Sequence, residues 1–238
     1  MDETRIIELL GISFPLNTMI AFGAVLVIVA FICLCLNRNL SVENPTKGQI
    51  LMESLVSFIK GIVRDNIGEQ ADKFYVIIAF GLFLFLLVAN YIGLILLVDV
   101  HEVSYFKSPT ADPVVAIVLA VIMNLLSHYF GAKAHGGLGK YIKAEYLSPN
   151  ILSLPITVVE EVINIFTLAL RLFGNIFAGE VLLKLIAQVG NSYGVLTWLA
   201  GIPLQMIWQI FSLFIGAIQA YIFVTLSSVY LSNKVSHK

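Results

Sequence analysis

Two apolar runs in the C-terminal half, residues 151–189 and 195–231, constrain the fold more than any other feature of the sequence. A helix over the first run is about 58 Å long at 1.5 Å per residue, whereas the hydrocarbon core of a bilayer is about 30 Å thick. No proline and no pair of glycines interrupts the middle of that run, and a turn at "RLFGN" leaves backbone exposed to lipid. We therefore expect two long helices, strongly tilted and joined as a hairpin through "GNSYG". The alternative is that each run breaks into two spans.

The rest of the chain is also apolar. Hydrophobic residues make up 59% and charged residues 12% of the 238 residues, against roughly 25% charged residues in a soluble domain. Three further runs, 14–36, 74–98 and 114–132, have the length of one crossing each. We expect an all-α membrane protein, a single membrane domain over residues 1–238 with about five membrane-crossing helices. The net charge of −1 gives no indication of nucleic-acid binding.

The segment 48–67 has the pattern of an amphipathic helix. Its charged residues Lys60 and Arg64 lie away from an apolar stripe. We expect this helix to lie in the membrane interface, although packing against its own neighbours is the alternative. The stripe contains Leu51, Leu55, Phe58 and Ile62.

The connecting segments alternate in charge. "NRNLSVENPTKG" and "GAKAHGGLGKYIK" carry most of the lysine and arginine, whereas "DVHEVSYFKSPTAD" is acidic. Because positive loops stay in the cytoplasm, we expect the N-terminus outside and the C-terminus inside a bacterial plasma membrane.

Polar residues follow the fourth run at helical spacing and then change face. At about 100° per residue, one stripe ends at Arg171 and Asn175, and a second begins at Glu180, about 180° around the helix from Arg171. The fifth run carries a polar face of its own. The first stripe contains Glu160, Asn164, Thr167, Arg171 and Asn175; the second Glu180, Lys184 and Gln188; and the third Gln205, Gln209, Ser212, Gly216 and Gln219.

Charges inside a membrane cost about 2.5–3.5 kcal/mol each on insertion scales, so such residues usually line a pathway or pair within a bundle. The pathway interpretation is the stronger one for Arg171, because it stands between two offset stripes. Packing roles stay open as alternatives: Lys184 neutralising Glu180, and Gln219 bonding between helices.

No catalytic motif is complete. "GNSYG" matches a nucleophile elbow in letters but joins two helices, and "HEVSY" lacks the second histidine of a zinc-protease helix. We expect no metal site, no cofactor and no nucleotide-binding loop.

"LALRLFGNIFAGE", the preceding "EE" and the later "IQAYIFVTLSSVYLS" together resemble subunit a of the rotary F-type ATP synthase. "PTAD" and "ANYIG" fit the same family, so the resemblance covers essentially the whole chain. It implies a non-catalytic subunit whose tilted helices follow a ring of c subunits and provide two offset half-channels to the ring's carboxylate. The other implied partners are the b subunit of the peripheral stalk, the rest of the complex and the lipid bilayer.

The resemblance also implies roles for individual residues. Arg171 resembles the essential stator arginine. Asn175, Glu180 and Gln219 match polar positions around the ring contact and the outer path. Those implied to line the half-channels are Asn90 and Asp112 at the outer entrance and Glu160 and Glu161 at the cytoplasmic mouth; the stripes add Asn164, Lys184, Gln188 and Ser212. Some members carry a histidine and an aspartate where this chain has Ser212 and Gly93, so the outer path does not carry over in detail.

Two other functions predict features that this sequence does not show. A stand-alone ion-coupled secondary transporter predicts inverted repeats and broken helices, and no internal repeat is visible. An intramembrane protease lacks its catalytic pairs. The sequence does not distinguish protons from sodium ions, because the resemblance implies that the ion ligands lie chiefly on the ring.

Overall fold

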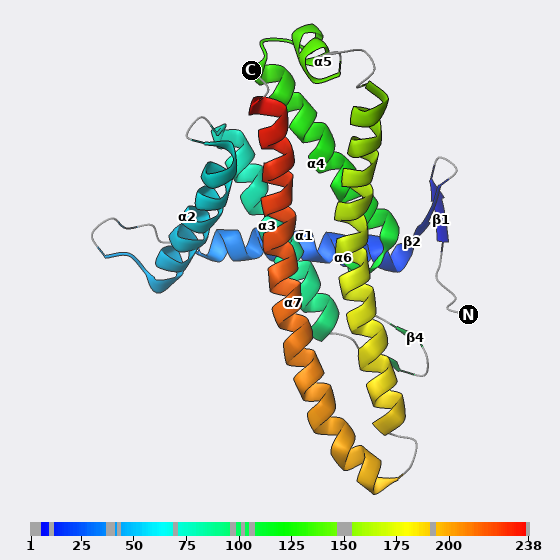
Figure 1. Cartoon of the computed structure of the whole chain (residues 1–238). Coiled ribbons are helices and arrows are strands. Elements are labelled where there is room, and N and C mark those ends of the chain that lie inside the picture. Colours follow the sequence, from blue (N-terminus) through cyan, green and yellow to red (C-terminus); the bar gives the residue numbers. More distant parts are fainter. Residues whose placement is uncertain are drawn as a thin grey trace. The chain divides into compact units, whose positions relative to one another are not determined.

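The computed structural model describes residues 6–9, 12–36, 41, 44–68, 71–95, 99–100, 103–104, 108–146, 154–190 and 194–236. Helices dominate these residues, which confirms the predicted all-α membrane fold. Their bounds, in chain order, are α1 Leu16–Leu36, α2 Lys47–Ile67, α3 Lys73–Ile95, the 3-10 helix η1 Pro109–Ala111, α4 Pro113–Ala134, α5 Leu138–Tyr146, α6 Leu154–Gly190 and α7 Val195–Ser236 (Figure 1).

Two short antiparallel strand pairs accompany the helices. β1 (Ile6–Leu9) pairs with β2 (Ile12–Pro15), and β3 (Asp99–Val100) pairs with β4 (Val103–Ser104). β2 takes up the first two residues of the predicted run 14–36, so α1 begins at Leu16. Residues 96–98 and 151–153 of the predicted segments, and 191–193 of the hairpin turn, lie outside the described residues.

The two C-terminal helices are each continuous. α6 has 37 residues and α7 has 42, and α7 passes through Pro203 without ending. Neither long run is divided into two spans by a turn, as the alternative required. At 1.5 Å per residue each helix is about 55 Å or longer, so a bilayer about 30 Å thick covers only part of it unless the helix is steeply inclined.

Among the described residues, four helical segments are long and apolar enough to cross a membrane: Thr18–Leu36, Lys73–Leu94, Pro113–Ala134 and Gly201–Val235. This criterion does not select α6, the most highly charged of the long helices. The crossing by α6 therefore stays a prediction.

The chain divides into two compact units, described separately below. The first comprises residues 1–31, 84–115 and 171–220; the second comprises 32–83, 116–170 and 221–238.

In the first unit, the C-terminal part of α6 and the N-terminal part of α7 lie side by side as an antiparallel hairpin (Figure 1). The helices approach closely near the turn, where a Cβ on Gly201 would lie 3.1 Å from the Cα of Gly190. Further along, the Trp208 indole donates to the Gly179 carbonyl over 3.4 Å. Small residues thus allow the two backbones to come together.

In the second unit, α2 buries one apolar side and exposes another. Met52, Ile59 and Val63 are buried, whereas Leu51 and Phe58 are about half exposed, at 55% and 47%. Thr46 caps the helix by accepting a hydrogen bond from the Gln49 backbone N–H. An amphipathic helix with exposed apolar side chains is what the interfacial prediction requires.

We expect Gly93→Ala to destabilise the first unit. A Cβ on Gly93 would lie 2.2 Å from the Ser108 Cβ, and Ser108 cannot retreat because its hydroxyl donates to the Ala89 carbonyl. Overpacking of this kind costs about 1–3 kcal/mol. The measurement is the temperature at which the chain leaves the detergent-solubilised complex. Gly81→Ala on the same helix is the control, since nothing lies within 4 Å of its added Cβ, and equal effects at both glycines would refute the packing argument.

Candidate functional site

Arg171 is the central residue of the candidate site. It lies in α6 beside the fully buried Leu172 and is itself partly buried. No ion pair joins it to the described residues of its own unit. A guanidinium keeps its charge and its five N–H donors in any protein environment, so this side chain is suited to meet an anion supplied from outside the unit.

Glu180 and Gln219 are the deeply buried polar residues of the predicted translocation set. Each is 5% exposed. Because α6 is continuous between Arg171 and Glu180, the nine intervening steps turn the helix by about 180°, and the two side chains point to opposite faces. The change of face predicted from the sequence is therefore present in the helix.

Asn175 and Ser212 line one cavity of about 170 Å³ between α6 and α7, which has room for several water molecules. Gly179 and Trp208 also border it. A Cβ on Gly179 would come within 3.6 Å of the Ser212 hydroxyl oxygen. The structure thus brings together two residues that the sequence assigned to different helices.

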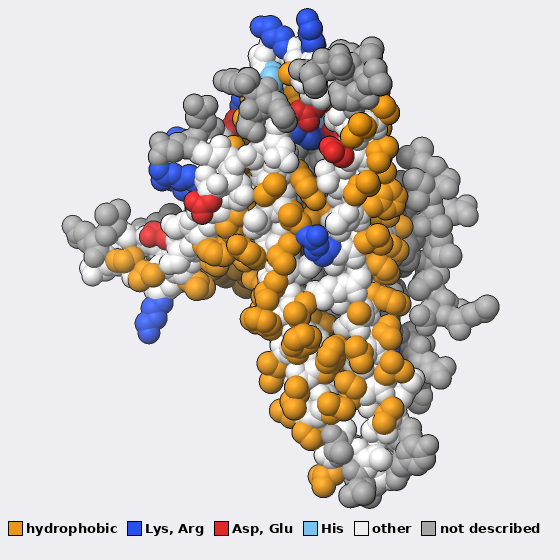
Figure 2. All heavy atoms as spheres, in the orientation of Figure 1, with side chains coloured by type: hydrophobic (Ala, Val, Ile, Leu, Met, Phe, Trp, Pro, Cys, Tyr) orange, Lys and Arg blue, Asp and Glu red, His pale blue; other side chains and the backbone are white. Residues whose placement is uncertain are grey.

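An apolar surface covers the α6–α7 hairpin of the first unit (Figure 2). Hydrophobic side chains gather there, with few polar side chains among them. Those at least 45% exposed include Phe177, Leu185, Val189, Leu199, Leu204, Met206, Ile207, Ile210, Phe211 and Phe214. Such a surface is compatible with lipid or with another membrane helix.

Asn90 is fully buried with both ends of its side chain bonded. Its Nδ2 donates to the Gly216 carbonyl over 3.0 Å, and its Oδ1 accepts from the Thr110 hydroxyl over 3.0 Å. The Thr110 and Ser108 hydroxyls lie 2.7 Å apart. This network holds α3, η1 and α7 together, and the role of Asn90 at the outer entrance stays a prediction.

Asp112 lies between η1 and α4. Its Oδ1 accepts from the Val114 N–H over 2.9 Å, and its Oδ2 accepts from the Thr18 hydroxyl of α1 over 3.4 Å. An aspartate at a helix N-terminus stabilises that helix. The side chain is only partly buried, so it stays accessible although it stabilises the start of α4.

In the second unit, Glu161 is the centre of a polar cluster. Its Oε1 accepts from the Lys234 ammonium over 3.1 Å and from the Tyr146 hydroxyl over 2.8 Å. Lys234, from the last turns of α7, is 5% exposed and also donates to the Asn124 amide oxygen over 3.2 Å. We call Asn124, His128, Tyr141, Tyr146, Glu161 and Lys234 the Glu161 cluster.

His128 connects the cluster to α5. Its Nε2 lies 2.7 Å from the Lys234 ammonium and 3.2 Å from Glu161 Oε1, and its Nδ1 lies 2.7 Å from the Tyr141 hydroxyl. Burial raises the pKa of Tyr141 and, with the Glu161 hydrogen bond, that of Tyr146. Both phenols therefore stay protonated at neutral pH.

The two adjacent glutamates differ in environment. Glu161 is held in the cluster, whereas Glu160 is exposed. Asn164, one turn on, borders a cavity of about 10 Å³ with Asn124 and Ser227, the size of about one water molecule. On the second stripe, Lys184 is partly buried and Gln188 is exposed.

The sequence missed Lys234 and Tyr146 as site residues. In the sequence, Lys234 indicates only on which side of the membrane the C-terminus lies. Tyr146 lies in a short helix that no long apolar run predicts. One signal was available: Asn124 and His128 share a face of an apolar helix, which calls for a polar partner. The identity of that partner depends on tertiary packing.

The family model described as "ATP synthase A chain" matches residues 18–232. The chain belongs to this family. The proteins named ATP synthase subunit a from Pediococcus pentosaceus and Enterococcus faecalis are 45% and 47% identical to it, over 96% and 88% of this chain and 95% and 87% of theirs. The one from Listeria monocytogenes serovar 1/2a is 41% identical over 99% of this chain and 98% of its own.

Membership of the ATP synthase A chain family fixes the coarse function. The chain is a component of an ATP synthase, with the rest of that complex as its partners, and it takes part in proton transport without itself being the catalytic subunit. Its apolar helices and bacterial relatives make it a bacterial membrane protein.

We expect Lys234→Met to destabilise the second unit by about 1–3 kcal/mol, because Glu161 then keeps its charge without its cationic partner. The double variant Glu161→Gln with Lys234→Met should recover much of that loss. Thermal release of the chain from the purified complex measures both. Lys133→Gln is the control, since its pair with Asp72 is exposed and should matter little. A double variant no better than Lys234→Met would show that the charge pair is not the cause.

Proposed function

We propose that this chain is the stationary proton-channel subunit of an F-type ATP synthase and that it couples proton flow to rotation of a c-subunit ring. Two half-channels open to opposite sides of the membrane and reach the ring carboxylate at different places. Arg171 lies between them, so a proton crosses the membrane only while it is bound to a carboxylate of the rotating ring.

The observation that carries this proposal is Arg171 itself: a charged side chain in a long apolar helix, with no ion pair to the described residues of its unit. An opposite charge within about 4–6 Å favours the ionised form of a carboxylate. A ring carboxylate arriving at Arg171 therefore releases its proton and passes as an anion. Arginine suits this task because lysine can lose its proton when buried.

The outer half-channel is proposed to use Glu180 and Gln219, with Asn175 and Ser212 at the cavity that they line. Lys184 and Gln188 continue this path along α6, and Asp112 lies at its entrance. Asn90 contributes by holding the lining helices together. The opposite orientation of Arg171 and Glu180 on α6 supports the offset between the two paths.

The inner half-channel is proposed to begin at Glu160 and continue past Asn164. Glu160 is free of the Glu161 cluster and exposed, as a proton-exchanging carboxylate at a channel mouth should be. Glu161, held by Lys234 and Tyr146, anchors the N-terminal part of α6. Lys234 on α7 then lies at the cytoplasmic side, in agreement with the proposed orientation, N-terminus outside and C-terminus inside.

The c-ring is the proposed occupant of the exposed apolar surface on the α6–α7 hairpin. Long helices inclined to the membrane can follow the curvature of a ring over several of its subunits, which accounts for their length. Each elementary charge that moves through 100 mV delivers about 2.3 kcal/mol, and the ring converts that work to torque. The b subunit is the proposed contact to the peripheral stalk.

Arg171→Gln is expected to abolish ATP-driven acidification of inverted membrane vesicles, while passive proton leak through the membrane sector persists or rises. The reason is that the charge separating the half-channels is gone. Acidification and leak are recorded on the same vesicles by a pH-sensitive dye, with Lys140→Gln on the exposed face of α5 as the control. Pumping by Arg171→Gln at the control rate contradicts the proposal.

Glu160→Gln is expected to slow ATP-driven pumping several-fold, more strongly when the cytoplasmic face is alkaline and protons are scarce there. Glu161→Gln in the Lys234→Met background should pump faster than Glu160→Gln. This double variant removes both charges of the anchoring pair, so neither charge is left without its partner. The pumping rate is measured against cytoplasmic pH at equal amounts of assembled complex. If Glu160→Gln pumps faster than the double variant, the proposal is contradicted, because Glu161 and not Glu160 would then be the proton-exchanging residue.

A further inference from the structure

The Nε2 atom of His128, in the second unit, lies within reach of both a hydrogen-bond donor and a hydrogen-bond acceptor. The Lys234 ammonium is 2.7 Å away, and the Glu161 Oε1 is 3.2 Å away. An ammonium can only donate and an ionised carboxylate can only accept, whereas a ring nitrogen is either bare or protonated. Nε2 can therefore bond to Lys234 or to Glu161, but not to both at once.

The contacts of Lys234 fit the arrangement in which Nε2 is bare. An ammonium has three N–H donors. Besides Nε2, this one has the Glu161 Oε1 at 3.1 Å and the Asn124 amide oxygen at 3.2 Å as acceptors. The side chain of Lys234 is 7% exposed, so little water is at hand to replace an acceptor that is lost.

The residues around His128 also fit the arrangement in which the ring is protonated. A protonated Nε2 donates to Glu161, which already accepts from the Tyr146 hydroxyl over 2.8 Å. At the other ring nitrogen, the Tyr141 hydroxyl lies 2.7 Å from Nδ1 and can donate or accept, so it suits either state. Lys234 cannot stay beside the protonated Nε2, because two cations would then lie in contact in a largely buried site.

The charged groups around the ring make this second arrangement attainable. Both tyrosines are neutral at pH 7, since burial raises the pKa of each phenol, which leaves two carboxylates and one ammonium. The second carboxylate, Glu145, has an oxygen, Oε2, that is buried without a hydrogen-bond partner among the described residues. A proton on His128 balances that extra negative charge. The titratable groups that surround the ring in the described part of the unit are Tyr141, Glu145 and Tyr146 from α5, Glu161 from α6 and Lys234 from α7.

We propose that His128 is a pH-sensitive switch: while its ring is neutral, Lys234 is bound to His128 and Glu161, and when the ring gains a proton, His128 bonds to Glu161 and releases Lys234. Imidazole is the side chain that ordinarily changes charge between about pH 5 and pH 8. Because the released arrangement binds one more proton, acidification populates it.

The switch controls how firmly the last turns of α7 are held. Lys234 lies in those turns, and its bonds reach Glu161 of α6 and Asn124 of α4. Once Lys234 is released, the end of α7 loses its polar contacts to both helices. The consequence for proton flow rests on the proposed function of Glu160, which neighbours Glu161 on α6, whereas the switch itself does not depend on that function.

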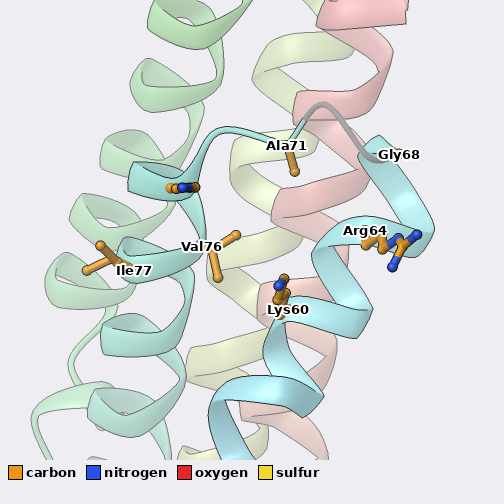
Figure 3. A pocket seen from close by; sticks show the side chains of 7 residues that line it. Lys60, Arg64, Gly68, Ala71, Val76 and Ile77 are labelled. Atoms are coloured by element: carbon orange, nitrogen blue, oxygen red, sulfur yellow. The ribbon is translucent and has the colours of Figure 1, made fainter.

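The test measures how readily Lys234 is acetylated in the whole purified ATP synthase complex, held in lipid nanodiscs so that both faces meet the same buffer. An amine-acetylating reagent is applied briefly at about pH 7.5 and at about pH 5.5, either side of the range in which imidazole titrates. Mass spectrometry of the digested chain then compares Lys234 with two exposed lysines, Lys143 of α5 and Lys60 at the cavity between α2 and α3 (Figure 3). Acid slows the reaction of every amine, so the ratio of Lys234 to the reference lysines reports its release. We expect this ratio to rise several-fold at the lower pH.

Substitutions of the histidines identify the titrating group. His128→Gln keeps an acceptor for Lys234 but cannot gain a proton, so the ratio should be low and equal at both pH values. His128→Arg supplies a permanent cation, so the ratio should be high at both. His135→Gln and His237→Gln are the matched controls and should respond like the native chain. Native gels establish that all four variants assemble.

Two results would overturn the proposal. A ratio that is the same at both pH values in the native complex would mean that Lys234 stays bound whatever the charge of the ring. A rise that persists in His128→Gln, or that disappears in His135→Gln or His237→Gln, would place the titrating group elsewhere. Acetylation requires no proton flow, so failure here and failure of the proposed channel function are separate results.

Discussion

The structure depends on one constraint: a guanidinium that cannot lose its charge stands in a long apolar helix, without an ion pair to the described residues of its own unit. A membrane protein normally pairs such a charge internally or places it beside water. No such partner lies among the described residues of its unit, and we propose that another subunit of the complex supplies it. In the proposed function, the length of α6, the change of face beyond Arg171 and the apolar hairpin surface all suit a partner that presents carboxylates in turn.

Around this arginine, the polar residues divide into those that hold helices and those that stay accessible. Asn90 and Glu161 have their side-chain oxygens bonded, and they connect segments far apart in the sequence. Glu160 and Asn175 are exposed or border a cavity. An unsatisfied polar group costs more in lipid than in water, so the bonded residues stabilise the packed helices, and the accessible ones are those proposed to carry protons. The sequence alone does not separate the two kinds, since Glu160 and Glu161 are adjacent and carry the same side chain.

Much of this could be predicted from the sequence, since hydrophobic run length and helical period are local properties. The continuous α6 and α7 followed from runs too long for one crossing and lacking a break, and the position of Glu180 opposite Arg171 followed from nine residues at about 100° each. Lys234 as the partner of Glu161 could not be predicted, because 73 residues separate them and only tertiary packing brings them together. Likewise, nothing local indicates that Ser108 fills the space beside Gly93. The strand pair β1–β2 has no separate signal in the sequence either, since its residues lie next to a stronger helical pattern.

The central claim is that protons pass between the half-channels only by rotation past Arg171. The most direct test locks rotation reversibly: a disulfide between Ile210→Cys, on the exposed apolar face of α7, and a cysteine on the ring of the assembled complex. Voltage-driven proton flux through the membrane sector is then recorded before and after reduction. The account predicts no flux while the disulfide holds and normal flux once it is reduced. Flux that continues through the locked complex would contradict it, because protons would then cross without the ring.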